Sequence, residues 1–291
     1  MTILIGTDFS PACASVAVTA AELARRRGED VILAHVVEGP SFHSASKGIA
    51  ATDDVHALLQ AHAHRLAAYG CRIRPLLERE GHCGQRLAQV AERENVRLLV
   101  VGAQGAGLRT PLGTTATALL RHTSLPVLVV RQPQRLWSAQ SDARLTALVA
   151  LALDATDEGL LDALGIVAGT GDFDADFVHY RPLPALAKWS VAEPLTNHEL
   201  RDYFGDLPVE LGVRSVFARD RLGEVDAHLN ELARERNVDL VVCGSHHRHG
   251  IDRVLHGSIA EGVVMRSPVS VLVARAPTPQ QQSFEQGHHG A

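Results

Sequence analysis

The chain has 291 residues, about twice the roughly 150 of a typical domain, so two domains are expected. Hydrophobic residues make up 46% and charged residues 21%, which is typical of a folded globular protein and not of a disordered chain. The formal net charge of −5, with no large basic excess, argues against binding to nucleic acid.

Membrane insertion and export are also disfavoured. The longest apolar stretch, Leu145–Leu153, is about half of the roughly 20 residues that a spanning helix needs. The N-terminus lacks a basic head followed by a long apolar segment. The four cysteines form no CxxC pair, which predicts reduced thiols in a cytoplasmic protein.

Short apolar runs alternate with helical patterns along the first half of the chain. The expected strands are Ile3–Gly6, Val31–Val37, Arg72–Leu77, Leu98–Val101 and Val127–Val130. Runs of this kind, without polar alternation, are typical of a parallel sheet covered on both faces. Ser10 is a good N-cap for a helix over Pro11–Arg27, and a second helix is expected over Gln85–Asn95 with one apolar face.

An internal repeat is the most informative pattern. Gly81–Gly102 and Gly223–Gly244 share a glycine, a leucine, an alanine, an Asn-Val pair and a terminal glycine in the same register. Further matches follow in order: Thr2–Asp8 with Leu148–Asp154, Gly113-Thr114 with Gly257-Ser258, and Val127–Arg131 with Val271–Arg275. The chain is therefore interpreted as a duplicated domain.

The expected fold is two tandem, doubly wound α/β domains, each with a parallel five-stranded sheet. Copy one is placed at residues 1–132 and copy two at 144–276, with a linker over 131–141. Copy two carries a longer, proline-containing segment over 181–212 after its second strand. The tail, 277–291, is rich in Gln, Gly and His and is expected to be disordered.

Ligands of open α/β sheets bind beyond the carboxyl ends of the strands, where the strand order reverses. If each copy has a flavodoxin-like order, Asp8 and Gly102 meet there, followed by a glycine-rich turn that includes Gly105. Gly113 and Thr114 then open the next helix, and such a turn is either plain turn chemistry or a cradle for phosphate.

Other nucleotide motifs are missing. The chain has no Gly-Lys-Ser/Thr, and neither of its two lysines, Lys47 and Lys188, follows a glycine-rich turn. No Gly-x-Gly-x-x-Gly follows either first strand. Few groups are left for efficient phosphoryl transfer.

These motifs together resemble the universal stress protein family. The resemblance rests on Thr7-Asp8-Phe9-Ser10-Pro11 after the first strand, on Leu33–Glu38, on a fourth strand ending in glycine, and on a final Pro-Val-Leu-Val-Val. A Gly-x₂-Gly-x₉-Gly-Ser/Thr signature follows the fourth strand in that family. The resemblance covers nearly the whole chain twice and implies a tandem member with the flavodoxin-like, adenine nucleotide alpha hydrolase-like fold.

In the ATP-binding branch of the family, the first-strand aspartate and the second-strand backbone hold adenosine, and the glycine signature holds the phosphates. The resemblance thus implies a nucleotide site, with ATP or another adenine nucleotide and with Mg²⁺ as an option. The implied residues are, in copy one, Asp8, Val36, Gly102, Gly105, Gly113, Thr114 and Thr115, and, in copy two, Asp154, Gly244, His247, Gly257 and Ser258.

Both copies depart from the family's signature. Copy one has seven residues, not nine, between Gly105 and Gly113, and Pro111 stiffens that shorter loop. Copy two keeps nine residues but has His247 in place of the second glycine. A side chain there obstructs close approach of phosphate to the backbone, although a protonated histidine could contact it. Copy one is therefore expected to be the better site.

No metal site and no catalytic set are expected. His62 and His64 lie two apart on a helix and do not share a face, while His246 and His247 are interpreted as solvated or phosphate-contacting. No nucleophile, base and orienting group can be assembled from the spacing, so ATP hydrolysis is at most weak.

Three functions stay open: a cytoplasmic stress-response protein that binds an adenine nucleotide, a structural or interaction module with degenerate pockets, and a slow ATPase. The resemblance also implies pairing through the last strands, Val127–Val130 and Val271–Val273. An internal pseudo-dimer of the two copies is expected, because an open apolar edge strand would promote aggregation. A further homodimer is an additional option, and the protein partner is not identified.

Overall fold

The computed structural model describes residues 2–37, 52–79, 81–104, 111–137, 144–152, 156–168, 173–182, 211–221, 224–245 and 259–275. The elements of copy one are β1 (Thr2–Gly6), α1 (Pro11–Arg27), β2 (Asp30–Val37), α2 (Thr52–Ala67), β3 (Ile73–Arg79), α3 (Cys83–Arg93), β4 (Leu98–Gly102), α4 (Thr114–His122) and β5 (Val127–Val130). The expected strands are confirmed, with ends that differ by at most two residues.

The described elements of copy two follow the same order, except between β7 and β8, where residues 183–210 lie outside the described ranges. They are β6 (Leu145–Leu151), α5 (Thr156–Ala168), β7 (Phe173–Pro182), β8 (Leu211–Arg221), α7 (Val225–Glu235), β9 (Leu240–Ser245), α8 (Ile259–Arg266) and β10 (Ser270–Arg275). Most of the proline-containing segment predicted over 181–212, and the whole tail 277–291, lie outside the described residues.

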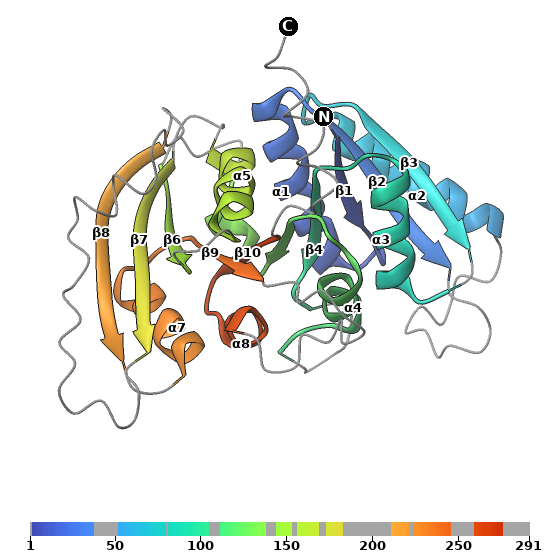
Figure 1. Ribbon diagram of the computed structural model, residues 1–291. Helices are drawn as coiled ribbons and strands as arrows, with labels where there is room; N and C mark the ends of the chain where they lie inside the picture. Colours follow the sequence, from blue (N-terminus) through green and yellow to red (C-terminus); the bar gives the residue numbers. More distant parts are fainter. Residues whose placement is uncertain are drawn as a thin grey trace, which may run out of the picture.

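The strands form one continuous sheet, ordered β3-β2-β1-β4-β5-β10-β9-β6-β7-β8 (Figure 1). Within each copy neighbouring strands are parallel. Between the copies β5 and β10 pair antiparallel, with Leu128 opposite Leu272. The two expected five-stranded sheets are thus present but merge into one, through the last strands as expected. We call this β5–β10 junction the seam.

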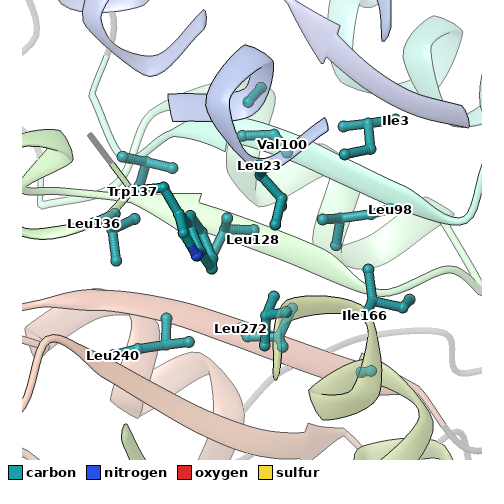
Figure 2. Packing of buried hydrophobic residues seen from close by; sticks show 14 of the residues in the cluster. Ile3, Leu23, Leu98, Val100, Leu128, Leu136, Trp137, Ile166, Leu240 and Leu272 are labelled. Carbon is teal, nitrogen blue, oxygen red and sulfur yellow. The ribbon is translucent and has the colours of Figure 1, made fainter. Parts of the chain in front are cut away.

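Helices cover both faces of the sheet, and each face has its own apolar core. One core gathers residues of α1, α2 and α5, and the other gathers residues of α3, α4, α7 and α8. Both cores contain residues from both copies, so the seam runs through the interior and not along a solvated boundary. Figure 2 shows Leu128 of β5 close to Leu272 of β10 within the first core.

Residues 133–137 of the predicted linker are ordered against this core. Pro133–Arg135 forms a 3₁₀ turn, η1, and then Leu136 and Trp137 are 2% and 3% exposed. Arg135 reaches copy two, where its Nη2 atom lies 2.9 Å from Oδ1 of Asp239. This part of the linker is a packed element because it has an aromatic and an aliphatic side chain to bury.

Capping explains where the helices begin and end. The Ser10 hydroxyl accepts the Cys13 N–H at 3.1 Å and Pro11 opens α1, as the sequence predicts. Helix α3 spans Cys83–Arg93 and not Gln85–Asn95, because Asn95 takes a left-handed conformation with φ of 50°. Asn237, its repeat partner, has φ of 49° after α7. The repeated Asn-Val pair is therefore a helix stop followed by a buried valine.

Candidate functional site

The strand order brings the predicted site residues of copy one to one edge. Strands β1 and β4 are parallel neighbours with Ile5 opposite Val100, so the ends of both strands reach the same edge of the sheet. Asp8 follows β1 and Gly102 ends β4. The chain order reverses between these two strands, which is where ligands of open α/β sheets bind.

Asp8 is exposed, and its carboxylate is held by the turn that follows β1. Its Oδ1 accepts the Ser10 N–H at 2.9 Å, and the Thr7 hydroxyl accepts the Phe9 N–H at 3.1 Å. Phe9 has φ of 61°, a left-handed conformation that a bulky side chain rarely takes. Strain of this kind clusters at functional sites, so the turn supports a binding role for this edge.

The Phe9 side chain forms an aromatic cluster with two histidines. Its ring centroid lies 4.5 Å from that of His35 on β2 and 5.6 Å from that of His62 on α2. His35 donates from Nδ1 to the Thr7 carbonyl oxygen at 2.7 Å, and a carbonyl partner requires the proton on that nitrogen. Burial lowers the pKa of His62. Sequence reasoning did not single out Phe9 or His35, since neither carries a phosphate- or metal-binding motif.

Gly102 sits where there is little room for a side chain. A Cβ atom there would lie 3.3 Å from the Gln104 carbonyl oxygen and 3.4 Å from a Val16 methyl group. The segment that follows, residues 103–113, is closed at its ends because the Gly113 N–H donates to the Ala103 carbonyl oxygen at 2.7 Å. Gly105 lies outside the described residues.

Helix α4 opens at this edge without a side-chain cap. Gly113 is the N-cap residue, and no acidic residue stands in the first turn. Thr114 is exposed and Thr115 is half-buried. A helix N-terminus with uncapped N–H groups attracts anions, so the predicted pair Gly113-Thr114 lies where a phosphate could be held.

Val36 stands near the end of β2 and is 6% exposed, packed in the core beneath α3 and α4. Its backbone, and not its side chain, is therefore the part that could meet a ligand. This agrees with the role that the family resemblance implies for this position.

Copy two differs at the position of Asp8. His179 contacts the Leu151 carbonyl oxygen as His35 contacts that of Thr7, and the Asp239 N–H bonds Thr146 as the Arg97 N–H bonds Thr2. These pairs make Leu151 the counterpart of Thr7. Ala152, the residue after Leu151, is therefore the structural counterpart of Asp8. The sequence repeat had paired Asp8 with Asp154.

Asp154 comes two residues later and lies outside the described residues, as do His247, Gly257 and Ser258. Gly244 is described, near the end of β9. The Ala152 N–H donates at 3.0 Å to Oδ1 of Asp157, which stands in the first turn of α5 and is 3% exposed. Asp157 was not predicted, because a carboxylate at a helix start is usually a simple cap.

The two site helices also differ in charge. Helix α8 has an acidic residue, Glu261, in its first turn, whereas α4 has none. Glu261 lies 3.9 Å from Arg121 of α4, so this contact crosses between the copies. A carboxylate near a helix N-terminus opposes a second anion there.

The cysteine thiol described near the edge of copy one is not activated. Cys13 lies under the Asp8 turn, where burial, reinforced by the Asp8 charge, raises its pKa to about 12. All four cysteines are free thiols.

Across the described ranges, no three His, Cys, Asp or Glu side chains gather as a metal site would require. Nor does any described helix combine the length and hydropathy needed to cross a membrane.

A doubly wound sheet whose strand order reverses between β1 and β4 defines an α/β protein of the open-sheet class. Comparison with protein-family models identifies the family. The universal stress protein model matches residues 1–131 and again 146–275, so the chain belongs to the universal stress protein family as a tandem member.

Relatives agree with this assignment. A universal stress protein of Mycobacterium tuberculosis is 25% identical over 307 aligned positions, covering 94% of this chain and 95% of the relative. Other matches are partial: another M. tuberculosis universal stress protein is matched over 61% of its length at 27% identity, and one of Staphylococcus haemolyticus over 48% at 32%. The crystal structure of an Archaeoglobus fulgidus universal stress protein superposes with a TM-score of 0.70 at 17% identity, covering 95% of this chain and 98% of that one.

Proposed function

We propose that this protein is a cytoplasmic stress-response protein that binds an adenine nucleotide, ATP or a smaller relative, at the carboxyl edge of copy one. The observation that carries the proposal is the convergence of exposed Asp8, Gly102 and the uncapped start of α4 at one edge. An exposed carboxylate suits the ribose hydroxyls, and the helix start suits phosphate. In this proposal copy one spans residues 1–132 and copy two 144–276.

In this proposal, different predicted residues contact the nucleoside and the phosphates. Asp8 and the Val36 backbone take the nucleoside, while Gly102, Gly105, Gly113, Thr114 and Thr115 take the phosphates. Mg²⁺ would enter only with the phosphates. The bond from Gly113 to Ala103 closes the shorter loop of copy one, which supports a working site despite the two missing residues.

Copy two is proposed as the weaker site. Its implied set is Asp154, Gly244, His247, Gly257 and Ser258. The ladder counterpart of Asp8 is Ala152, and the α8 start carries Glu261. Both features favour weaker binding of an anionic ligand than in copy one.

Calorimetric titration with ATP and with AMP tests this assignment. Asp8→Ala should weaken binding about tenfold or more, because a hydrogen bond to a charged group is worth roughly 1.5–3 kcal/mol. Asp154→Ala should have a smaller effect, and Asp54→Ala, on the exposed side of α2, should have none. If Asp154→Ala abolishes binding and Asp8→Ala leaves it intact, copy two is the site.

The second candidate is an interaction module whose pockets no longer bind nucleotide, favoured by the shortened loop of copy one and by His247 in copy two. Native mass spectrometry of freshly purified protein separates the two functions. A co-purified nucleotide appears as added mass. Its absence, together with a flat titration at millimolar ATP, would favour the interaction module.

A further inference from the structure

Two arginines related by the repeat lie at the seam. Arg131 follows β5, and Arg275 ends β10. Each is the last residue of the repeated Val-Leu-Val segment, and each reaches across to the other copy. Arg275 is 4% exposed, and burial lowers its pKa to about 10. Burial also lowers the pKa of Arg131.

Arg131 connects the site segment of copy one to the end of helix α8 in copy two. Its Nη2 donates to the Pro111 carbonyl oxygen at 2.9 Å, inside segment 103–113. The same nitrogen lies 2.5 Å from the Val264 carbonyl oxygen and 3.3 Å from that of Met265, in the last turn of α8. The Arg131 guanidinium thus contacts both segment 103–113 and the last turn of α8.

Arg275 makes the mirror-image connection. Its Nη1 donates at 2.5 Å to the hydroxyl of Ser245, the last residue of β9. Its Nη2 donates to the Leu120 carbonyl oxygen in the last turn of α4. Leu120 and Val264 are both the third residue from the end of their helices. The helix contacts are therefore reciprocal between the copies, whereas the partner within the same copy is the Pro111 carbonyl oxygen for Arg131 and the Ser245 hydroxyl for Arg275.

The helices involved are those whose N-termini open at the candidate ligand edges. A cation at a helix C-terminus satisfies free carbonyl groups and complements the helix dipole. At about 3.6 residues per turn, helices of this length have between two and three turns, so the last turn lies within two turns of the first. Helix α4 spans nine residues and α8 eight.

We propose that Arg131 and Arg275 couple the two copies: Arg131 ties the end of segment 103–113 to the last turn of α8, and Arg275 ties the end of β9 to the last turn of α4, so a change in one copy shifts the helix of the other. The hydrogen bonds of Arg131 and Arg275 are present in the structure without a ligand. Only the second arm of the test below, which adds ATP, rests on the proposed function. The coupling would give the chain a reason to keep two unequal copies in one sheet.

The first arm needs no ligand and uses amide hydrogen exchange on the full chain. Pro111→Gly loosens segment 103–113 and should speed exchange at residues 264–267 of copy two about fivefold or more. In an Arg131→Leu background the same Pro111→Gly change should leave residues 264–267 unaltered. Arg131→Gln serves the same purpose if the leucine variant fails to fold.

Arg135→Leu is the matched control. Arg135 also crosses between the copies at this edge, but it pairs with Asp239 just before β9 and, among the described residues, with none of α8. The residues that follow it, Leu136 and Trp137, pack into the core on the other face of the sheet from α8. With Arg135→Leu, the response of residues 264–267 to Pro111→Gly should survive. An equal response with and without Arg131, or no response in either, would overturn the proposal.

The second arm adds ATP to a chain carrying Asp154→Ala. Binding in copy one should slow exchange at residues 264–267, and Arg131→Leu should remove this effect while titration still detects ATP. If no ATP binds but the first arm succeeds, the proposed function fails and the coupling stands. If ATP binds and neither arm shows transfer across the seam, the coupling fails and the proposed function stands.

Discussion

At the residue scale, small changes of side chain decide how the two copies are packed. In copy one Gly84 of α3 faces Ala118 of α4, whereas in copy two Asp226 of α7 faces Gly262 of α8. The glycine is thus on the first helix of the pair in copy one and on the second helix in copy two, and the larger residue is on the other helix in each case. Asp226 then pairs with Arg266. The helix pairs stay close in both copies because one member of each contact has no side chain.

Gly84→Ala should therefore destabilise copy one. A Cβ atom at Gly84 would lie 2.6 Å from the Thr115 carbonyl oxygen, so α4 has to shift. Overpacking of this kind costs about 1–3 kcal/mol, measurable by urea denaturation. Gly165→Ala on α5 is the control: its Cβ meets nothing within 4 Å, and alanine should raise stability by up to about 1 kcal/mol. Equal effects from both substitutions would contradict this reading of the helix contact.

Cys243 should make the fold sensitive to alkali. Burial raises the pKa of its thiol to about 12, well above the value of a free thiol. The folded state then holds this proton more tightly than the unfolded state. Its contribution is complete below about pH 8.5 and is lost as the pH rises toward 12, by up to about 1.4 kcal/mol per pH unit.

The measurement compares wild type with Cys243→Ala at pH 8 and at pH 10 by urea denaturation. The wild type should lose more stability over this interval than the alanine variant, whose cavity cost does not depend on pH. Arg275, whose pKa burial lowers to about 10, is kept in both proteins, so its own titration is common to the two pH dependences. A pH dependence that is unchanged by Cys243→Ala would show that the thiol is not the cause.

At the element scale, the connection between the copies is itself structural. Trp137 follows the 3₁₀ turn η1 and joins the core that contains Leu23 of α1, Leu240 of β9 and Leu272 of β10 (Figure 2). Next to it, Arg135 and Gln132 bond to copy two, the latter at 2.9 Å from the Pro268 carbonyl oxygen. The connection thereby fixes the two copies on one face while Arg131 fixes them at the ligand edge.

Trp137→Ala should destabilise the whole molecule by about 3–5 kcal/mol, the usual cost of removing a buried aromatic side chain. Because its core includes residues of both copies, both should unfold at lower urea concentration, as far-ultraviolet circular dichroism would report. A loss below about 1 kcal/mol, or a loss confined to one copy, would mean that the indole is not part of a shared core.

At the scale of the whole molecule, the two copies have the same framework but different edges. The antiparallel seam removes the two last strands from solvent and leaves β3 and β8 as the outer strands. Copy one presents Asp8 and an uncharged α4 start, while copy two presents Glu261 at α8. This difference between the edges is the basis for the proposal that copy one is the better nucleotide site.

Turnover by this molecule should be slow. No lysine follows a glycine-rich turn, and the thiol beside Asp8, that of Cys13, has a pKa that burial raises to about 12. Steady-state ATP hydrolysis should stay far below the roughly 1–1,000 per second of dedicated enzymes. A phosphate-release assay on rigorously purified protein, with Asp8→Ala as control, measures it. Ordinary enzymatic rates that vanish in Asp8→Ala would refute this expectation.

The sequence by itself determined the duplication, the alternation of strands and helices and the strand boundaries of copy one to within two residues, because apolar runs and caps are local features. It also placed Asp8 and Gly102 at one edge, since the carboxyl ends of parallel strands meet there. It did not give the end of α3, which depends on the left-handed conformation of Asn95. Nor did it determine the register of β6. The apolar run Leu145–Leu153 is longer than the strand, and only pairing with β7 and β9 puts Ala152 level with Asp8. The contacts of Arg131 and Arg275 between the copies were decided by the tertiary structure alone, because the carbonyl oxygens involved lie in the other copy.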